Sequence, residues 1–160
     1  MLRLVVANLN YSSWSMRAWL GLKRSGAAFK VFDVGLKTQD GWKERILQFS
    51  GAGKVPVLID GASSIHESLA ILETVHEKFP AAGLWPKDPA LRARGRAIST
   101  EMASSFFALR EQMPTTLRGR ARQRPQGKTL DEDIQRVLEI LDASLSSSKG
   151  EFLLGELSIA

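Results

Sequence analysis

A proline inside a short apolar run constrains this chain more than any other feature. Residues 54–72 read KVPVLIDGASSIHESLAIL, so Pro56 interrupts a β-like stretch. Because proline has no N–H to donate to a strand ladder, Pro56 must lie at an edge, a bulge or a special turn. A cis Val55–Pro56 bond is one way to meet this requirement. Such a bond would turn the N–H and C=O of Val55 outward, where they can pair with an extended ligand.

Two further signals follow this proline. Asp60 and Gly61 form a strong turn pair, which predicts a β-hairpin. Glu67 and Ser68 then stand at the start of an amphipathic helix. They would offer a carboxylate, a hydroxyl and helix N-terminal N–H groups close to the proline turn. This combination suits a small peptide-like ligand that carries an amine and a carboxylate.

The first 80 residues alternate strand and helix patterns. The patterns over residues 2–7, 13–24 and 29–34 form a β-α-β unit, which predicts parallel pairing through a right-handed crossover. Further elements are expected at residues 42–49, 55–59, 63–66 and 68–79, which together predict a small mixed sheet with helices. The apolar helix faces are expected at Met16, Trp19 and Leu20, at Trp42, Ile46 and Phe49, and at Leu69, Leu72, Val75 and Phe79.

The pattern changes after residue 80. Pro80, Pro86 and Pro89 bracket Trp85, which predicts a linker over residues 81–89 that is pinned by one aromatic side chain. Beyond it the signals are helical only. We therefore expect one domain over residues 1–80 and a second, all-α domain over residues 90–160.

Two long helices are expected in the second domain. Asp88 is a candidate N-cap for the first, and an apolar stripe continues over residues 91–109 for about five turns. Thr129 and Glu132 form a capping box that begins the second helix. Its apolar residues are Ile134, Val137, Leu138, Leu141 and Leu145.

Composition narrows the function classes. The chain has no cysteine and two histidines, so disulfides, thiolate zinc sites and a cysteine nucleophile are ruled out and a metal site is not expected. No apolar run approaches the roughly 20 residues that span a bilayer, and a cytoplasmic protein is the default. Residues 92–128 hold nine basic residues against Glu101 and Glu111. No aromatic residue interleaves with the arginines of residues 118–128, so a solvated loop is favoured over nucleic-acid binding.

An α/β half with Val-Pro before a hairpin and Glu-Ser at a helix start, followed by an all-α half, resembles the cytosolic glutathione transferase family. The resemblance runs over the whole chain. It implies a thioredoxin-like N-terminal domain, a helical C-terminal domain, glutathione as co-substrate and a homodimer. The last residues, FLLGELSIA, are similar to a segment that the family continues with an aspartate and a long buried helix. On this basis we expect the C-terminal domain to be truncated.

The segment Tyr11-Ser-Ser-Trp-Ser-Met-Arg17 is similar to the Ser-Ser-Cys-Ser-x-Arg signature of the zeta class. The resemblance aligns Ser12 with the catalytic serine, whose hydroxyl donates to the glutathione thiolate, and Arg17 with the signature arginine. Tyr11 is a rival donor, and an N-cap pair is the alternative reading of Ser12 and Ser13. Trp14 replaces the cysteine of the signature, which weakens the case for zeta-type isomerase activity.

The remaining site residues are carried over from the same resemblance. Glu67 and Ser68 match the pair that holds the γ-glutamyl amine and carboxylate, and Val55, before Pro56, matches the residue whose backbone pairs with the cysteinyl unit. Lys54 matches a residue near the glycyl end, and Ser13 and Pro56 complete the residues that are expected to bind glutathione. The pocket for the second substrate is expected at Trp14, Phe106, Phe107 and Arg110, although Phe106 also fits a core stripe.

We therefore interpret the sequence as a serine-type glutathione transferase that conjugates glutathione to a hydrophobic electrophile. Two alternatives remain: a binding module that keeps the fold without chemistry, and a zeta-like glutathione-dependent isomerase. The sequence does not identify the electrophile.

Overall fold

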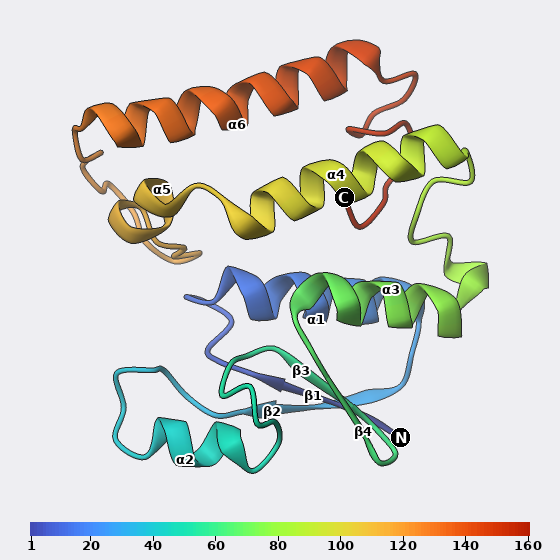
Figure 1. Ribbon diagram of the computed structural model, residues 1–160, viewed down its shortest axis with the longest axis vertical. Coiled ribbons are helices and arrows are strands. Elements are labelled where there is room, and N and C mark those ends of the chain that lie inside the picture. Colours follow the sequence, from blue (N-terminus) through green and yellow to red (C-terminus); the bar gives the residue numbers. More distant parts are fainter. The chain divides into compact units, whose positions relative to one another are not determined.

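The computed structural model describes residues 1–160, and the chain divides into two units, Met1–Leu84 and Trp85–Ala160. The first unit contains four strands and three helices, with a short 3-10 turn at its end (Figure 1). In chain order they are β1 (Leu2–Val6), α1 (Ser13–Ser25), β2 (Phe29–Asp33), α2 (Trp42–Leu47), β3 (Val57–Asp60), β4 (Ser63–His66), α3 (Ser68–Lys78) and η1 (Pro80–Ala82).

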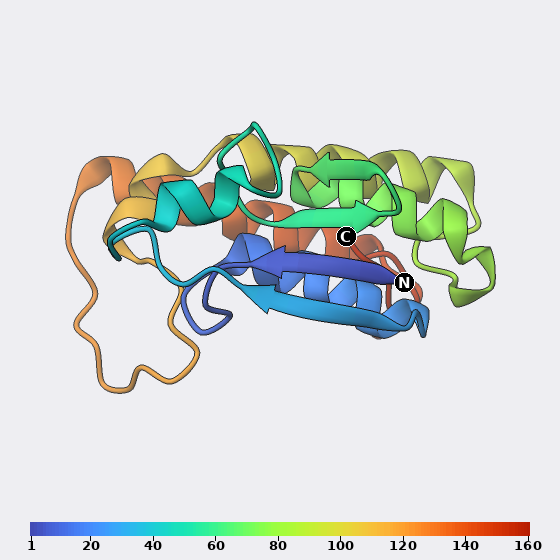
Figure 2. The same cartoon turned by 90° about the horizontal axis from the view of Figure 1, so that it is seen from below.

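The four strands form one mixed sheet in the order β2-β1-β3-β4 (Figure 2). β1 pairs with β2 in parallel, which confirms the pairing predicted for the β-α-β unit. β3 runs antiparallel to both β1 and β4. The predicted hairpin is confirmed as well, with Gly61 at its turn in the left-handed region (φ 60°) that glycine adopts without strain. This is the thioredoxin-like arrangement expected from the sequence.

Helices cover both faces of the sheet. α1 and α3 lie side by side on one face, and α2 lies on the other (Figure 1). On the α2 side, Trp42 and Ile46 pack with Val5, Val57 and Ile59, so the face predicted for this helix is confirmed. α3 buries Ile71, Leu72 and Val75, whereas Leu69 and Phe79 are only half-buried. Two of the four residues predicted for that face are therefore outside the core.

The predicted apolar face of α1 is wrong. Leu20 is exposed, Met16 and Trp19 are half-buried, and the buried residues are Ser15, Ala18, Gly21 and Leu22. The helix packs closely against its neighbours through small side chains, which an amphipathic pattern of large residues does not reveal. The consequence is that Ser15, a polar residue, is fully buried beneath the first turn of α1.

The second unit is helical, with α4 (Pro89–Ser104), α5 (Phe107–Gln112) and α6 (Lys128–Ser147). The Asp88 side chain caps α4, as predicted, by accepting from the N–H of Leu91 at 2.8 Å. The only buried residue of α4 is Gly95. Leu154 and Trp85 approach it so closely that an added Cβ would lie 2.8 Å from Leu154 Cδ1 and 2.9 Å from Trp85 Cζ3. Residues 113–127 run as a loop without helix or strand (Figure 2).

Two helix predictions for this unit are wrong. The stripe over residues 91–109 is not one helix, because Ser105 is extended and Phe106 takes a left-handed conformation (φ 64°) that separates α4 from α5. α6 begins at Lys128 and has no side-chain cap, so Thr129 lies inside the helix and forms no capping box. Its buried residues are Leu130, Ile140 and Ser144, while Leu138, Leu141 and Leu145 are exposed.

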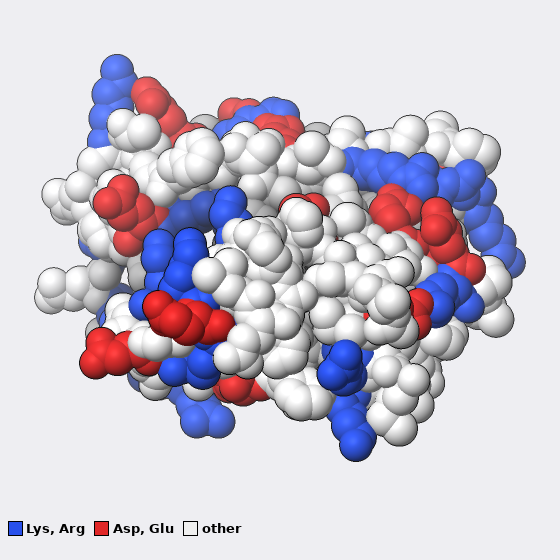
Figure 3. All heavy atoms as spheres, turned by 60° about the horizontal axis from the view of Figure 1, so that its bottom comes forward, with Lys and Arg blue, Asp and Glu red and all other residues white.

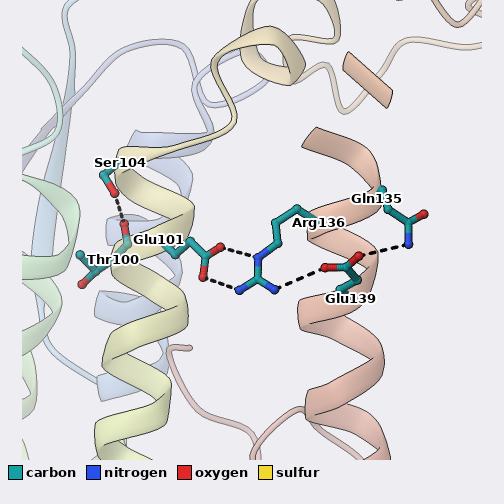
Figure 4. A network of polar contacts seen from close by, with 6 residues as sticks. All are labelled: Thr100, Glu101, Ser104, Gln135, Arg136 and Glu139. Atoms are coloured by element: carbon teal, nitrogen blue, oxygen red, sulfur yellow. Dashed lines mark hydrogen bonds and ion pairs between the residues drawn. The ribbon is translucent and has the colours of Figure 1, made fainter. Parts of the chain in front are cut away.

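Long polar side chains join α4 to α6. Arg136 donates from Nε and Nη2 to the two oxygens of Glu101, at 2.7 and 3.1 Å (Figure 4). Nearer the other end, Arg94 donates to the carbonyl of Ala143 at 2.7 Å. The hydrogen bond and charge of Arg136 hold the pKa of Glu101 below its ordinary value, against a smaller opposing effect of desolvation. The pair therefore stabilises the folded state when Glu101 is ionised.

This pairing predicts a pH-dependent loss of stability in Glu101→Gln. Because the pKa of Glu101 is lower in the folded state, its contribution is present above the ordinary glutamate pKa of about 4.3 and is lost as the pH falls through the lowered value. At neutral pH the variant should melt slightly below the unsubstituted chain, since an exposed pair contributes little. As the pH falls through the lowered value, the two melting temperatures should converge. Glu111→Gln, at an exposed position of α5 without an ion pair, is the control, and a difference that stays equal from neutral to acid pH would contradict the assignment.

Candidate functional site

The strand register brings three separate segments to one end of the sheet. Val5, near the end of β1, pairs with Val57 at the start of β3, and Val57 pairs in turn with His66 at the end of β4. The turn into α1, the Val55–Pro56 step and the start of α3 therefore lie together at this end of the strands, which forms one edge of the molecule's first unit. This edge collects the residues that the sequence predicts as ligand-binding in the first unit.

The first segment is the turn that begins α1. Ser12 is the N-cap residue, and its Oγ accepts from the N–H of Ser15 at 3.3 Å. The capping role considered as an alternative for Ser12 is thus present in the structure. Tyr11 precedes it and is exposed, with 53% of its surface accessible. Arg17 stacks over the Trp14 ring, 4.6 Å from its centroid.

The second segment contains the proline. The Val55–Pro56 bond is cis, as considered from the sequence. Pro56 is buried, whereas Val55 is half-buried against the core cluster on the α2 side. The β3 ladder begins only at Val57, and the N–H and C=O of Val55 make no hydrogen bond with the rest of the chain. These two groups are available to pair with an extended ligand. Lys54 beside them is exposed.

The third segment begins α3. Glu67 is its N-cap residue, and its carboxylate accepts from the N–H of Leu69 at 3.0 Å and from Ser68 Oγ at 2.9 Å. A carboxylate has about four acceptor positions, so two remain for a ligand amine. Ser68 is buried, whereas Glu67 is exposed. The backbone of Glu67 has φ 76° and ψ 134°, a conformation that residues other than glycine rarely adopt. No pattern in the sequence indicated this backbone strain.

A hollow of about 550 Å³ lies beside the turn that follows β1. Its lining includes Asn8, Asp33, Gln39, Asp40 and Arg45. Asn8 connects it to the first segment, because the carbonyl of Asn8 accepts from the N–H of Ser12 at 2.9 Å. Arg45 is held in place by donating to the carbonyls of Val34 and Asp40. The sequence did not indicate this hollow, since its residues come from the turn after β1, the end of β2, the loop that follows and α2, and they form no recognisable motif.

The edge therefore joins two helix N-termini, unpaired backbone groups and a carboxylate. Helix N-termini favour negative charge through their free N–H groups and the helix dipole. The carboxylate of Glu67 favours a cation, and the backbone of Val55 favours a peptide group. Such a site can hold a zwitterionic peptide and place one anionic atom near Ser12.

Three predicted site residues belong to the second unit. Phe106 is buried, and Phe107 is 74% exposed. Arg110 donates from Nε to the carbonyl of Ser105 at 3.0 Å and also to the carbonyl of Met102, so it caps the C-terminal end of α4. Partial burial lowers the pKa of the Arg110 guanidinium, and the charge of Asp133 opposes this effect. A structural role is thus evident for Arg110, which the sequence assigned to a second-substrate pocket.

No three side chains of the types that ligate metals lie close enough together to hold an ion. No helix is both long and apolar enough to cross a membrane. On the face drawn in Figure 3, basic and acidic side chains lie interspersed among uncharged surface.

Comparison with known proteins identifies relatives over most of the chain. Residues 11–78 match the family model of the glutathione S-transferase N-terminal domain. A probable maleylacetoacetate isomerase of Caenorhabditis elegans is 30% identical over 144 residues, which cover 90% of this chain and 66% of the relative. The maleylacetoacetate isomerase of Rattus norvegicus is 32% identical, covering 90% and 65%. A probable glutathione S-transferase of Nicotiana tabacum is 29% identical, covering 91% and 60%. The chain thus spans 60 to 66% of the length of these relatives.

Solved structures share the fold. A diazinon-metabolizing glutathione S-transferase of the silkworm Bombyx mori superposes with a TM-score of 0.76 at 20% identity, over 99% of this chain and 74% of that one. A glutathione transferase homolog from Burkholderia, solved with bound glutathione, gives a TM-score of 0.75 at 23% identity, over the same shares.

The strain at Glu67 predicts an order of stability for two variants. Glu67→Gly and Glu67→Ala both remove the carboxylate cap, but only glycine adopts the native φ and ψ without steric cost. We expect the glycine variant to be more stable than the alanine variant by about 1 kcal/mol, despite the greater flexibility of glycine when unfolded. Urea unfolding of the two variants measures the difference. An alanine variant as stable as the glycine variant would show that the backbone is relaxed there.

Proposed function

The chain belongs to the glutathione S-transferase family through its N-terminal domain, and on that premise we propose that it binds glutathione and activates its thiol as a nucleophile. The observation that carries this proposal is the strand register that brings Ser12, Val55 and Glu67 to one edge of the sheet. Each of the three offers a group that a different part of glutathione requires. We further propose that the electrophile is a small hydrophobic molecule.

Activation of the thiol is the chemical problem that the site must solve. A free thiol has a pKa of about 8.5 and is mostly protonated at neutral pH. A hydroxyl that donates to the sulfur stabilises the thiolate, and one charge-assisted hydrogen bond contributes about 1.5–3 kcal/mol, or one to two pKa units. Ser12 lies at the N-terminus of α1, where the helix dipole acts in the same direction. In this proposal the site is of the serine type.

The rest of the site would hold the peptide. The free N–H and C=O of Val55 can pair with the cysteinyl backbone in the manner of an added strand. Glu67 can receive the γ-glutamyl amine, and Ser68 with the first N–H groups of α3 can receive its carboxylate. The sulfur would then be held near Ser12 by contacts that do not themselves involve the sulfur. Binding and thiol activation are therefore carried by different residues.

A second candidate function is isomerisation that uses glutathione without consuming it. The relatives named as a probable and as a known maleylacetoacetate isomerase, at 30 and 32% identity, favour it. The two reactions differ in their thiol balance. Conjugation forms a lasting S–C bond and consumes one thiol per turnover, whereas isomerisation forms and breaks that bond and returns the thiol. Counting free thiols against product therefore separates them, and glutathione binding with no turnover of either substrate class would favour a non-catalytic binding module.

We expect Ser12→Ala to raise the pKa of bound glutathione by about one to two units and to leave the affinity for glutathione within a few fold. Turnover should fall by roughly 10²-fold, the typical cost of losing one donor to a developing anion. Thiolate absorbance measured against pH reports the pKa. Ser25→Ala, at the other end of α1, is the control. If Tyr11→Phe shifts the pKa and Ser12→Ala does not, the donor is Tyr11.

Glu67→Gln should have the opposite profile. The substitution keeps the backbone conformation and the acceptor oxygen but removes the charge, so the dissociation constant for glutathione should rise by roughly tenfold. The pKa of the bound thiol should hardly change, because the γ-glutamyl amine is remote from the sulfur. Titration calorimetry measures the affinity, with Glu77→Gln on the exposed side of α3 as control. Unaltered binding would leave Glu67 as a helix cap only.

A further inference from the structure

Ser15 is a polar side chain that neither the core nor the proposed chemistry accounts for. It is fully buried in the first turn of α1. Its Oγ accepts from the N–H of Ala7, at the end of β1, at 3.1 Å. The same Oγ lies 3.1 Å from the Oγ of Ser12. Ser15 therefore connects the end of the central strand to the hydroxyl that is proposed to meet the sulfur.

The direction of the bond between the two hydroxyls is not fixed by their positions. Each hydroxyl has one proton and two acceptor positions, and the proton rotates to suit its partner. The two oxygens are close enough to share one proton at a time. Either Ser12 donates to Ser15, or Ser15 donates to Ser12 and the proton of Ser12 is free for another acceptor.

The surroundings of Ser15 favour donation to Ser12. Other helix hydroxyls in this chain donate to the carbonyl four residues earlier, as Thr74 does to Ala70 and Ser104 to Thr100, both at 2.9 Å. Ser15 makes no such bond, so Ser12 Oγ is the acceptor within its reach. A buried hydroxyl proton without an acceptor is unfavourable. Donation to Ser12 removes that deficit.

We propose that Ser15 is a positioning residue for thiol activation, whose hydroxyl donates to Ser12 so that Ser12 can turn its own proton to the sulfur of glutathione. This inference rests on the proposed function. In the resulting chain, the N–H of Ala7 donates to Ser15, Ser15 donates to Ser12, and Ser12 donates to the thiolate. Only hydroxyl rotation is required, and no proton is transferred between residues.

In this arrangement the hydroxyl of Ser12 becomes a stronger hydrogen-bond donor to the sulfur of glutathione. A hydroxyl that accepts hydrogen bonds becomes a better donor, because successive bonds in a chain polarise one another. Ser12 Oγ would accept twice from Ser15, from its N–H at 3.3 Å and from its hydroxyl at 3.1 Å. Both acceptor positions of Ser12 are then filled, and its proton is left for the anion. The buried Ala7 N–H fixes Ser15 in the orientation that makes this possible.

The test is a double-mutant cycle read by the pKa of bound glutathione. The proteins are the unsubstituted chain, Ser12→Ala, Ser15→Ala and the double variant, each titrated by the thiolate difference absorbance with and without glutathione. We expect Ser15→Ala to raise this pKa by about 0.3 to 1 unit, since it removes one bond of the chain and its polarising effect. The double variant should match Ser12→Ala, because Ser15 acts through Ser12. Glutathione affinity should stay within a few fold.

A purely structural role gives a different result. Ser15→Ala also leaves the Ala7 N–H without a partner and should lower stability, so Ala18→Gly in the same buried face of α1 is the destabilised control. The control should keep the pKa of the unsubstituted chain. If Ser15→Ala does not fold, Ser15→Cys replaces it, since the thiol keeps the volume but is a weak donor. It should raise the pKa in the same direction.

Three outcomes would overturn the inference. If Ser12→Ala raises the pKa while the Ser15 variants leave it unchanged, Ser15 is structural and the proposed function stands. If the shifts of the single variants add in the double variant, Ser15 acts on the sulfur independently of Ser12. If the unsubstituted chain binds no glutathione, or Ser12→Ala leaves the pKa unchanged, the proposed serine mechanism fails and the role of Ser15 fails with it.

Discussion

The candidate site depends on the antiparallel pairing of β3 with both β1 and β4. This pairing sets Val5, Val57 and His66 in one row across the sheet, so the segments that follow or precede these residues meet at one edge. A slip by one residue would turn the side chains of β3 to the opposite faces of the sheet. Val57 and Ile59 pack with Trp42 and Ile46 on the α2 side, and a slip would break this packing. Core packing thereby fixes the positions of groups that are themselves at the surface.

The two helices whose N-termini lie at this edge, α1 and α3, begin in different ways. At the start of α1, Ser15 Oγ bonds both to Ser12 Oγ and to the N–H of Ala7 at the end of β1. α3 begins with a residue in a strained conformation, whose carboxylate bonds to Ser68 and Leu69. The first arrangement suits an anionic atom that needs a hydroxyl donor. The second suits the two charged groups of an amino acid. This division of chemistry is the basis of the proposal that separate residues hold glutathione and activate its thiol.

The second unit relies on backbone breaks and polar links more than on a continuous apolar stripe. The left-handed conformation of Phe106 separates α4 from α5. Arg110 donates to the carbonyl of Ser105 at the end of α4. The carboxylate of Asp133 accepts from the N–H of Leu109 in the first turn of α5. Arg136 and Arg94 then hold α4 beside α6. Three leucines of α6, Leu138, Leu141 and Leu145, remain exposed. Periodicity alone could not reveal this, because a helical pattern shows which residues share a face and does not show which face is covered.

The elements of the first unit, its parallel β-α-β start, the hairpin and the proline step could be predicted from the sequence, because these depend on local turn chemistry and on strand periodicity. The sequence also singled out Ser12, Val55, Glu67 and Ser68 as one group of candidate residues. The buried face of α1, and with it the position of Ser15, depends on tertiary packing, since three of the four buried residues of this helix are small and do not stand out in the sequence. The strain at Glu67 and the break at Phe106 were likewise decided by packing. In each case contacts between distant segments select a backbone conformation that local propensity disfavours.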